Sequence, residues 1–138
     1  MPSIEPSPEK LQKLVAEAND DSPLVMINLL RYRDRAEYPQ GSDETPCTGE
    51  EAYQRYAALV LPMLEELGAK LLWRGSVKHV VIGPASEEWD EALLVQQPSR
   101  RAFLTLVSRP DYLRAAAHRS AALADSRLIA TATVASGF

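Results

Sequence analysis

Residues 24–30 are apolar in both side-chain phases of an extended chain, which predicts a β-strand buried on both faces. One face would carry Val25, Ile27 and Leu29, and the other Leu24, Met26 and Leu30. The polar side chain of Asn28 interrupts the second face, and Arg31 and Tyr32 end the run. A strand of this kind needs a cover on each side, so we expect the rest of the chain to be organised around it.

Helical spacing and capping residues predict the helices on either side of this strand. Ser7 and Pro8 are typical of a helix start, which places a leading helix and turn at 7–22. Thr48 and Glu51 have the spacing of a capping box, and Gly68 is a typical stop for the helix that follows. A further helix begins after Ser99 and is broken and restarted at 108–111, and residues 134–138 form a loose tail.

Three more strands are predicted, at 69–83, 91–97 and 128–133. In the first of them Leu71, Trp73, Val77 and Val81 share a face unless a β-bulge intervenes, and Gly75 is the expected bulge position. The order after the leading helix is β-α-β-β-α-β, typical of a ferredoxin-like α+β fold with an antiparallel sheet. We therefore expect a single domain over residues 1–138.

Two main helices cover only one face of such a sheet, although strands 24–30, 92–95 and 128–130 are apolar on both faces. Monomeric proteins rarely expose so large an apolar surface. A second copy of the chain, packed sheet to sheet around a two-fold axis, is the expected cover, so a homodimer is predicted.

The chain resembles the DUF1330 family, in the dimeric α+β barrel superfamily. The segments that carry the resemblance are 28–33, 49–56, 82–84, 88–90, 97–103 and 122–129. The resemblance implies the ferredoxin-like dimeric α+β barrel and no settled activity, because the superfamily includes cofactor-free monooxygenases, isomerases, haem-binding enzymes and non-catalytic members.

Composition narrows the class of partners. The formal net charge of -4 over 138 residues disfavours a nucleic-acid partner, because phosphate binding needs a basic surface. The chain has one cysteine, Cys47, and no signal-peptide pattern or bilayer-length apolar run, so we expect a cytoplasmic protein without membrane association. No metal-binding or cofactor-binding motif is present, so neither a metal nor a cofactor is expected.

His118 and Arg119 are the first candidates for chemistry, at the end of the second main helix. One interpretation is a cation favoured at a helix C-terminus. The other is a general acid or base with an adjacent anion-binding arginine, because histidine titrates near neutral pH. Asn28 is the third catalytic candidate, either paired with nearby backbone or directed into a cavity between sheet and helices, where it would stabilise an enolate-like oxygen.

Five further residues are candidate ligand-binding groups: Arg31, Tyr53, Tyr56, Trp73 and Trp89. Each also has a purely structural interpretation, because aromatic stripes at helical spacing are usually core and a surface arginine often pairs with a carboxylate. The leading hypothesis is a dimer that binds a small apolar molecule with a carbonyl or anionic group, as a binding protein or as an oxygenase- or isomerase-like enzyme. The alternative is a non-catalytic binding or structural dimer. The polar loop 33–47 is expected to be mobile, or ordered by a partner or ligand.

Overall fold

The structure, a computed structural model, describes residues 2–17 and 21–136. The described part contains α1 (Pro8–Ala16), β1 (Leu24–Tyr32), α2 (Gly49–Glu66), β2 (Lys70–Ser76), β3 (Glu91–Gln97), α3 (Arg100–Ser108), α4 (Pro110–Ala122) and β4 (Leu123–Thr131). The α+β fold and the order of its elements agree with the sequence analysis. Ala18 and the turn residues Asn19 and Asp20 lie outside the described residues, as do residues 137–138 of the expected tail.

The four strands form one antiparallel sheet in the order β2-β3-β1-β4. β1 is therefore an inner strand with a partner on each side, as its apolar pattern requires. Its register aligns Asn28 with Leu93 of β3 and with Leu128 of β4. Residues that are aligned in this way point to the same face of the sheet, which lets the register place every side chain relative to Asn28.

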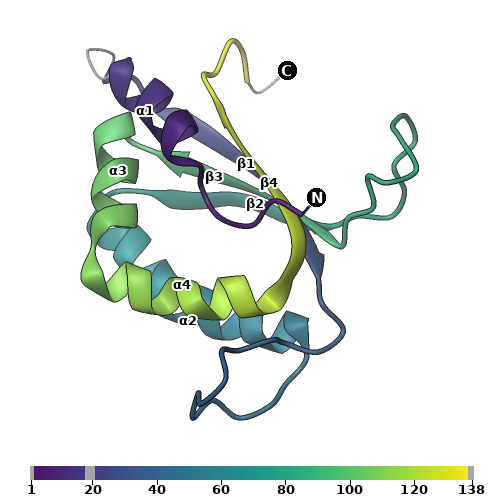
Figure 1. The fold of residues 1–138 in the computed structure, drawn as a ribbon. Coiled ribbons are helices and arrows are strands. Elements are labelled where there is room, and N and C mark those ends of the chain that lie inside the picture. The colour runs from purple at the N-terminus through teal and green to yellow at the C-terminus, as the bar shows by residue number, and fades with distance from the viewer. Residues whose placement is uncertain (1, 18–20, 137–138) are drawn as a thin grey trace.

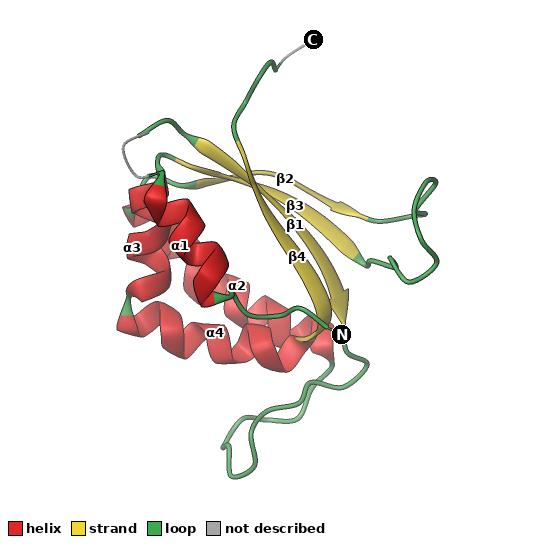
Figure 2. Ribbon diagram, turned by 45° about the horizontal axis from the view of Figure 1, so that its top comes forward, coloured by secondary structure: helices red, strands yellow, loops and turns green. Residues whose placement is uncertain are grey.

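The helices lie together on one face of the sheet, and none of the helices in the described part of the chain covers the opposite face (Figures 1 and 2). α1 and α3 lie at one end of the sheet, and α2 and α4 cross beneath it toward the other end (Figure 2). Leu24, Met26 and Leu30 face the helices and are at most 4% exposed. Their alternating neighbours Val25, Ile27 and Leu29 face the open side and are partly exposed.

The capping residues act as their spacing predicts. The Thr48 hydroxyl accepts a hydrogen bond from the Glu51 N–H at 3.1 Å, and the Glu51 carboxylate accepts one from the Thr48 N–H at 3.0 Å. Gly68 has φ 77°, which is the left-handed conformation expected of a residue that ends a helix. A Cβ atom on Gly49 would lie 2.2 Å from the Arg33 carbonyl oxygen, so only glycine fits where α2 begins.

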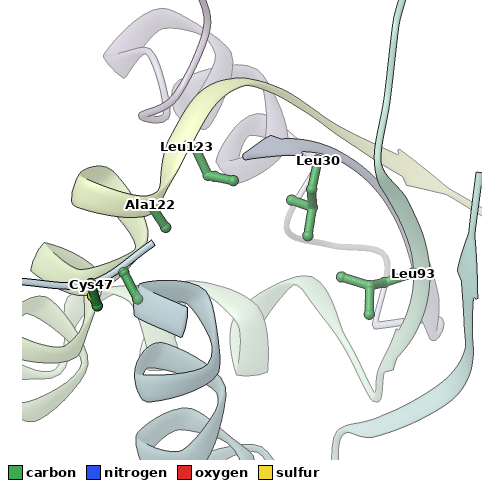
Figure 3. Close-up of a cluster of buried hydrophobic side chains, with 6 residues drawn as sticks. Leu30, Cys47, Leu93, Ala122 and Leu123 are labelled. Carbon is green, nitrogen blue, oxygen red and sulfur yellow. The ribbon is translucent and has the colours of Figure 1, made fainter. Parts of the chain in front are cut away.

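One cluster of buried side chains joins the start of α2 to the end of the sheet, and Figure 3 shows its labelled members pointing toward one another. It consists of Leu30, Cys47, Ala52, Leu93, Ala122 and Leu123. Leu30, Ala122 and Leu123 have no exposed surface. The cluster therefore fixes the position of α2 and α4 relative to the central strands.

The strand predicted at 69–83 is wrong in length and in the position of its irregularity. β2 ends at Ser76, and residues 77–90 form a loop that extends beyond the sheet (Figure 2). The register shifts between Leu71 and Trp73 rather than at Gly75. The extra residue, Leu72, places Leu71 and Trp73 on opposite faces, because a bulge reverses the alternation of side chains.

The final strand begins earlier than the predicted 128–133. β4 starts at Leu123, directly after α4, and ends at Thr131. The start of β4 contains polar residues, so it does not show the apolar run by which the strand was predicted. Asp125 and Ser126 are buried, and Ser3 at the N-terminus makes hydrogen bonds to both: its N–H donates to Asp125 and its carbonyl accepts from the Ser126 hydroxyl.

The loop 33–47 contains no helix or strand, as predicted, but backbone hydrogen bonds tie it to α4. The N–H groups of Arg33 and Glu37 donate to the carbonyl oxygens of Ala122 and Ala121 at 2.8 and 2.9 Å. The Ala36 N–H donates to the Cys47 carbonyl, which closes the loop on itself. The expected mobility of the loop stays a prediction.

Candidate functional site

A cavity of about 1160 Å³ lies between the helix-facing side of the sheet and the helices. Strands β1, β2, β3 and β4 form its floor, and α1, α2, α3 and α4 supply the opposite walls. Leu61, Leu71 and Leu128 line the cavity and are still 42–45% exposed, so the cavity opens to solvent. Its volume slightly exceeds the roughly 300–1,000 Å³ that small-molecule sites usually have.

The floor of the cavity changes from apolar to polar along β1. The register aligns Met26 with Val95 of β3 and Ala130 of β4, which gives an apolar row across the sheet. Two residues further along β1, Asn28 lies in a row with Leu93 and with Arg74 of β2. Apolar side chains from α1 and α3 complete the apolar part, among them Leu11, Leu14, Phe103 and Leu106.

Arg74 lines the polar part of the cavity and is paired with a buried carboxylate. Its guanidinium makes two hydrogen bonds to Glu91, and the Tyr32 hydroxyl donates a third at 2.5 Å. Burial opposes ionisation of Glu91, but the hydrogen bonds from Arg74 and Tyr32 prevail and lower the pKa of its carboxyl group. Glu91 thus neutralises Arg74.

Arg119 also lines the cavity, and its charge is not neutralised in this way. Its guanidinium donates to the Ile4 carbonyl and, at 3.4 Å, to the Ser126 hydroxyl, both of which are neutral. Among the residues that the structure describes, no carboxylate lies within 4.0 Å of Arg119. A guanidinium has five N–H donors, so three of them remain available to an anionic group.

Tyrosine hydroxyls lie beside this cation. Burial raises the pKa of Tyr53 to about 12, although the nearby charge of Arg119 lowers this pKa in part. Burial also raises the pKa of Tyr56 well above its usual value. The Tyr56 hydroxyl lies 3.0 Å from the Tyr112 hydroxyl. At neutral pH the side chains of Tyr53 and Tyr56 are therefore both uncharged, and their hydroxyls can donate hydrogen bonds.

Four of the eight residues singled out in the sequence line the cavity: Asn28, Tyr53, Tyr56 and Arg119. The Asn28 amide donates a long hydrogen bond of 3.3 Å to the Met26 carbonyl. The other four residues are not brought to the cavity: Arg31, Trp73, Trp89 and His118. Trp73 lies on the open face and is 52% exposed, because the bulge at Leu72 turns it away from the helices.

Arg31 and Trp89 hold the 77–90 loop against the end of the sheet. The Arg31 guanidinium donates to the carbonyl oxygens of Ser86 and Glu88, each at 2.7 Å. Two guanidinium groups lie over the Trp89 ring, that of Arg31 at 5.6 Å and that of Arg127 at 5.0 Å from the ring centroid. These contacts give both residues a structural role at the base of the loop.

His118 contacts the loop 33–47 rather than the cavity. Its Nδ1 atom lies 2.7 Å from the Tyr38 hydroxyl, and its Nε2 atom lies 3.8 Å from Glu44. Arg55 of α2 donates to the same Tyr38 hydroxyl at 3.3 Å and to the Thr45 carbonyl at 3.0 Å. His118 therefore lies within a hydrogen-bonded group that joins α2, α4 and the loop.

Sequence reasoning missed several polar residues of the cavity, among them Arg74, Gln97 and Ser126. Arg74 was missed because the bulge at Leu72, which no glycine marks, sets the face to which it points. Gln97 lies in the same helix-facing phase as Leu93 and Val95, so the period-2 pattern could have found it. Ser126 lay in a segment that the sequence analysis did not assign to a strand.

Residues 2–17 and 21–136 contain no group of three or more histidine, cysteine, aspartate or glutamate side chains placed to hold a metal ion. Within the same residues, no helix has the length and apolar character needed to cross a bilayer.

A family model described as a domain of unknown function, DUF1330, matches residues 44–133. The chain belongs to this family. It is similar over 99% of its length to the RPA0582 protein of unknown function from Rhodopseudomonas palustris, with 38% identity, a TM-score of 0.89 and all of that chain covered. The structure of methylated RPA0582 protein is similar at 37% identity and a TM-score of 0.90, covering 98% of that chain.

A more distant structure, a dimeric protein of unknown function and ferredoxin-like fold from Bacteroides fragilis, shares 12% identity over 78% of this chain and 93% of its own, with a TM-score of 0.48. No functionally curated protein matches the chain. The RPA0582 protein is itself described as a protein of unknown function, so the comparison indicates no activity for this chain.

Proposed function

We propose that this DUF1330 protein binds a small molecule with an apolar body and an anionic or carbonyl group in the cavity between sheet and helices. The observation that carries the proposal is Arg119, a cation that faces a largely apolar cavity and has only neutral partners among the described residues. A buried or half-buried charge without a counter-ion is costly, and an anionic ligand group would reduce that cost.

The ligand's orientation follows from the two parts of the cavity. Its polar group would lie near Arg119, Tyr53 and Asn28, which together offer a cation and neutral hydrogen-bond donors. Its apolar body would extend along β1 over Met26 and Val95 toward α1 and α3. Burial of that body would supply most of the binding free energy, at about 25 cal/mol per Å² of apolar surface.

Binding is better supported than catalysis by the placement of the candidate base. An oxygenase- or isomerase-like reaction on a carbon acid needs a group that removes a proton. His118, the base in the sequence hypothesis, contacts Tyr38 and Glu44 and does not line the cavity. Tyr53 and Asn28 would still be suited to polarise a ligand carbonyl by hydrogen bonding.

Displacement of a fluorescent dye tests this proposal. Anilinonaphthalene sulfonate, an apolar anion, should gain fluorescence with the protein, and dodecanoate should displace it about tenfold better than the neutral dodecan-1-ol. Arg119→Gln should reduce that preference for the acid. Equal displacement by acid and alcohol in the wild type would contradict an anion-binding role for Arg119.

Two matched substitutions on α2 test the place of binding. Val60 lines the cavity and is 4% exposed, so Val60→Phe should fill part of the cavity and weaken dodecanoate binding about tenfold. Its neighbour Leu59 is 48% exposed and does not line the cavity, so Leu59→Phe should leave binding unchanged. Similar effects of both substitutions would place the binding site elsewhere.

We also propose that the open face of the sheet packs against a second copy of the chain. Ile27, Leu94 and Ile129 lie on this face, where no helix covers them, and Trp73 and Ile129 are 52% and 47% exposed. The 77–90 loop adds Val81 and Ile82, which are at least 90% exposed. An apolar surface of this extent is typical of an interface, and the same face on two copies can pair around a two-fold axis.

Sedimentation equilibrium at micromolar concentration tests the homodimer. The wild type should show twice the 15.2 kDa mass of the chain. Ile129→Glu, which places a charge on the open face, should give a folded protein of single mass, and Leu113→Glu on the exposed side of α4 should remain a dimer. A monomeric, folded wild type would overturn the proposal.

A further inference from the structure

Gln97 is the last residue of β3, and at the apolar end of the cavity its side-chain amide has no hydrogen-bond partner among the described residues. The residue is only 2% exposed, and its Oε1 atom is buried without a hydrogen bond. Its Nε2 atom donates no hydrogen bond to residues 2–17 or 21–136, and Gln97 is one of the residues that line the cavity. Because a buried amide without a partner costs about 1–3 kcal/mol, its presence here calls for a physical reason.

The surroundings of Gln97 do not supply that reason. The register pairs it with Leu24, and both point to the helix-facing side, as does Met26. Leu24 and Met26 pack there with Phe103 of α3 in one apolar cluster. An apolar residue of similar volume would pack here at no cost in hydrogen bonding. The amide would gain a partner if the molecule in the cavity presented one.

We propose that Gln97 binds a hydroxyl group at the far end of the ligand, so that the cavity selects an elongated molecule that is polar at both ends. The inference rests on the proposed function, because it takes the anionic end to lie near Arg119. A hydroxyl both donates and accepts a hydrogen bond, so it can pair with either atom of the amide, whichever way the amide is turned.

The register also gives the length of such a ligand. Gln97 is aligned with Leu24, Asn28 lies four residues along β1, and Ser126, which contacts Arg119, is aligned with Leu30, six residues along. At about 3.3 Å per residue these separations are roughly 13 and 20 Å. An extended saturated chain of about twelve carbons, with bonds of about 1.5 Å, falls in that range. An ω-hydroxy carboxylate of this length is therefore the ligand class that fits both ends.

Competition between two acids tests the inference in the wild-type protein. ω-Hydroxydodecanoate should displace the dye about five- to tenfold better than dodecanoate, the worth of one hydrogen bond to a buried amide. The eight-carbon pair, ω-hydroxyoctanoate and octanoate, is the control, because the shorter chain cannot reach Gln97 and Arg119 together. A hydroxyl preference of the same size in both pairs, or in neither, would overturn the inference.

Gln97→Met removes the amide and keeps the side-chain volume. In this variant the preference for ω-hydroxydodecanoate should disappear, while dodecanoate should bind at least as well as in the wild type, because its apolar end then meets an apolar residue. An undiminished preference in Gln97→Met would show that the hydroxyl is recognised elsewhere. If dodecanoate fails to displace the dye from the wild type, the proposed function itself fails, and the inference fails with it.

Discussion

The two faces of the sheet are both largely apolar, yet they differ in what covers them. On the helix-facing side of β1, Leu24 and Leu30 pack against helices, and the cavity over Met26 and Asn28 remains between them. On the opposite side, no helix or strand of the described residues covers Ile27 and Leu29 (Figure 2). Hydrophobic residues along a strand therefore predict that each face of the strand is buried. They do not predict whether the covering element comes from the same chain.

The polar residues of the two faces differ in a related way. On the helix-facing side Arg74 is paired with Glu91, and Gln97 faces the cavity, where Arg119 of α4 lines the opposite wall. On the open side Arg31 and Arg127 both lie over the Trp89 ring at the base of the 77–90 loop. The first arrangement suits a ligand, and the second fixes a loop at the edge of an apolar surface.

The largest expected effect comes from truncating one side chain on each face of β1. Leu30→Ala should reduce the free energy of unfolding by about 2–5 kcal/mol, because Leu30 has no exposed surface and its loss leaves a cavity in the core. Ile27→Ala should cost less in dilute protein. The loss of unfolding free energy caused by Ile27→Ala should increase with protein concentration, since the proposed dimer buries that face.

Urea unfolding at two protein concentrations measures both effects. Leu30→Ala serves as the control, because its cost should not depend on concentration. If the loss of unfolding free energy caused by Ile27→Ala is equally independent of concentration, the open face is not an interface. The two faces of the sheet would then differ only in how far the same chain buries them.

A smaller effect is expected from Tyr53 at alkaline pH. Tyrosine in an unfolded chain has a pKa near 10.0, and burial raises the pKa of Tyr53 to about 12 in the folded protein. The folded state then holds its proton more tightly, so stability present below pH 10 is lost as pH rises toward 12. The loss attributable to Tyr53 is on the order of 2 kcal/mol by pH 12.

Chemical denaturation of the wild type and of Tyr53→Phe between pH 8 and about pH 12 measures this loss. The difference in unfolding free energy between the two proteins should shift in favour of the variant as the pH rises. A constant difference across the range would mean that Tyr53 is not buried beside the cavity.

The smallest effect is expected from His118→Ala, which removes one of the two hydrogen-bond partners of the Tyr38 hydroxyl and leaves Arg55 as the other. Loss of this hydrogen bond should cost about 1 kcal/mol and increase hydrogen exchange in the loop 33–47. Dodecanoate affinity should stay within about twofold, because His118 does not line the cavity. A tenfold fall in affinity with an intact fold would instead support the role of pocket base.

The elements that local chemistry specifies were predictable from the sequence. The capping box of Thr48 and Glu51 and the stop at Gly68 each follow from a few neighbouring residues. The face of the sheet to which Trp73 and Arg74 point could not be predicted from neighbouring residues, because the bulge at Leu72 arises from how β2 pairs with β3. Pairing between strands that are distant in the sequence cannot be recognised from a local pattern of apolar and polar residues.

The candidate site was predictable to the extent that its residues face inward at a regular period. Tyr53 and Tyr56 of α2 follow helical spacing toward the sheet, and both line the cavity. His118 and Arg119 are adjacent in the sequence, but successive helix residues point about 100° apart, so only one of them reaches the cavity. Which of the two does so depends on how α4 is rotated against the sheet.

A crystal structure of the protein with bound dodecanoate would test the central claim most directly. The account predicts the carboxylate within hydrogen-bond distance of Arg119 or Tyr53, and the alkyl chain over Met26 and Val95 toward Gln97. A cavity closed by side chains, with dodecanoate bound instead on the open face of the sheet, would contradict the account.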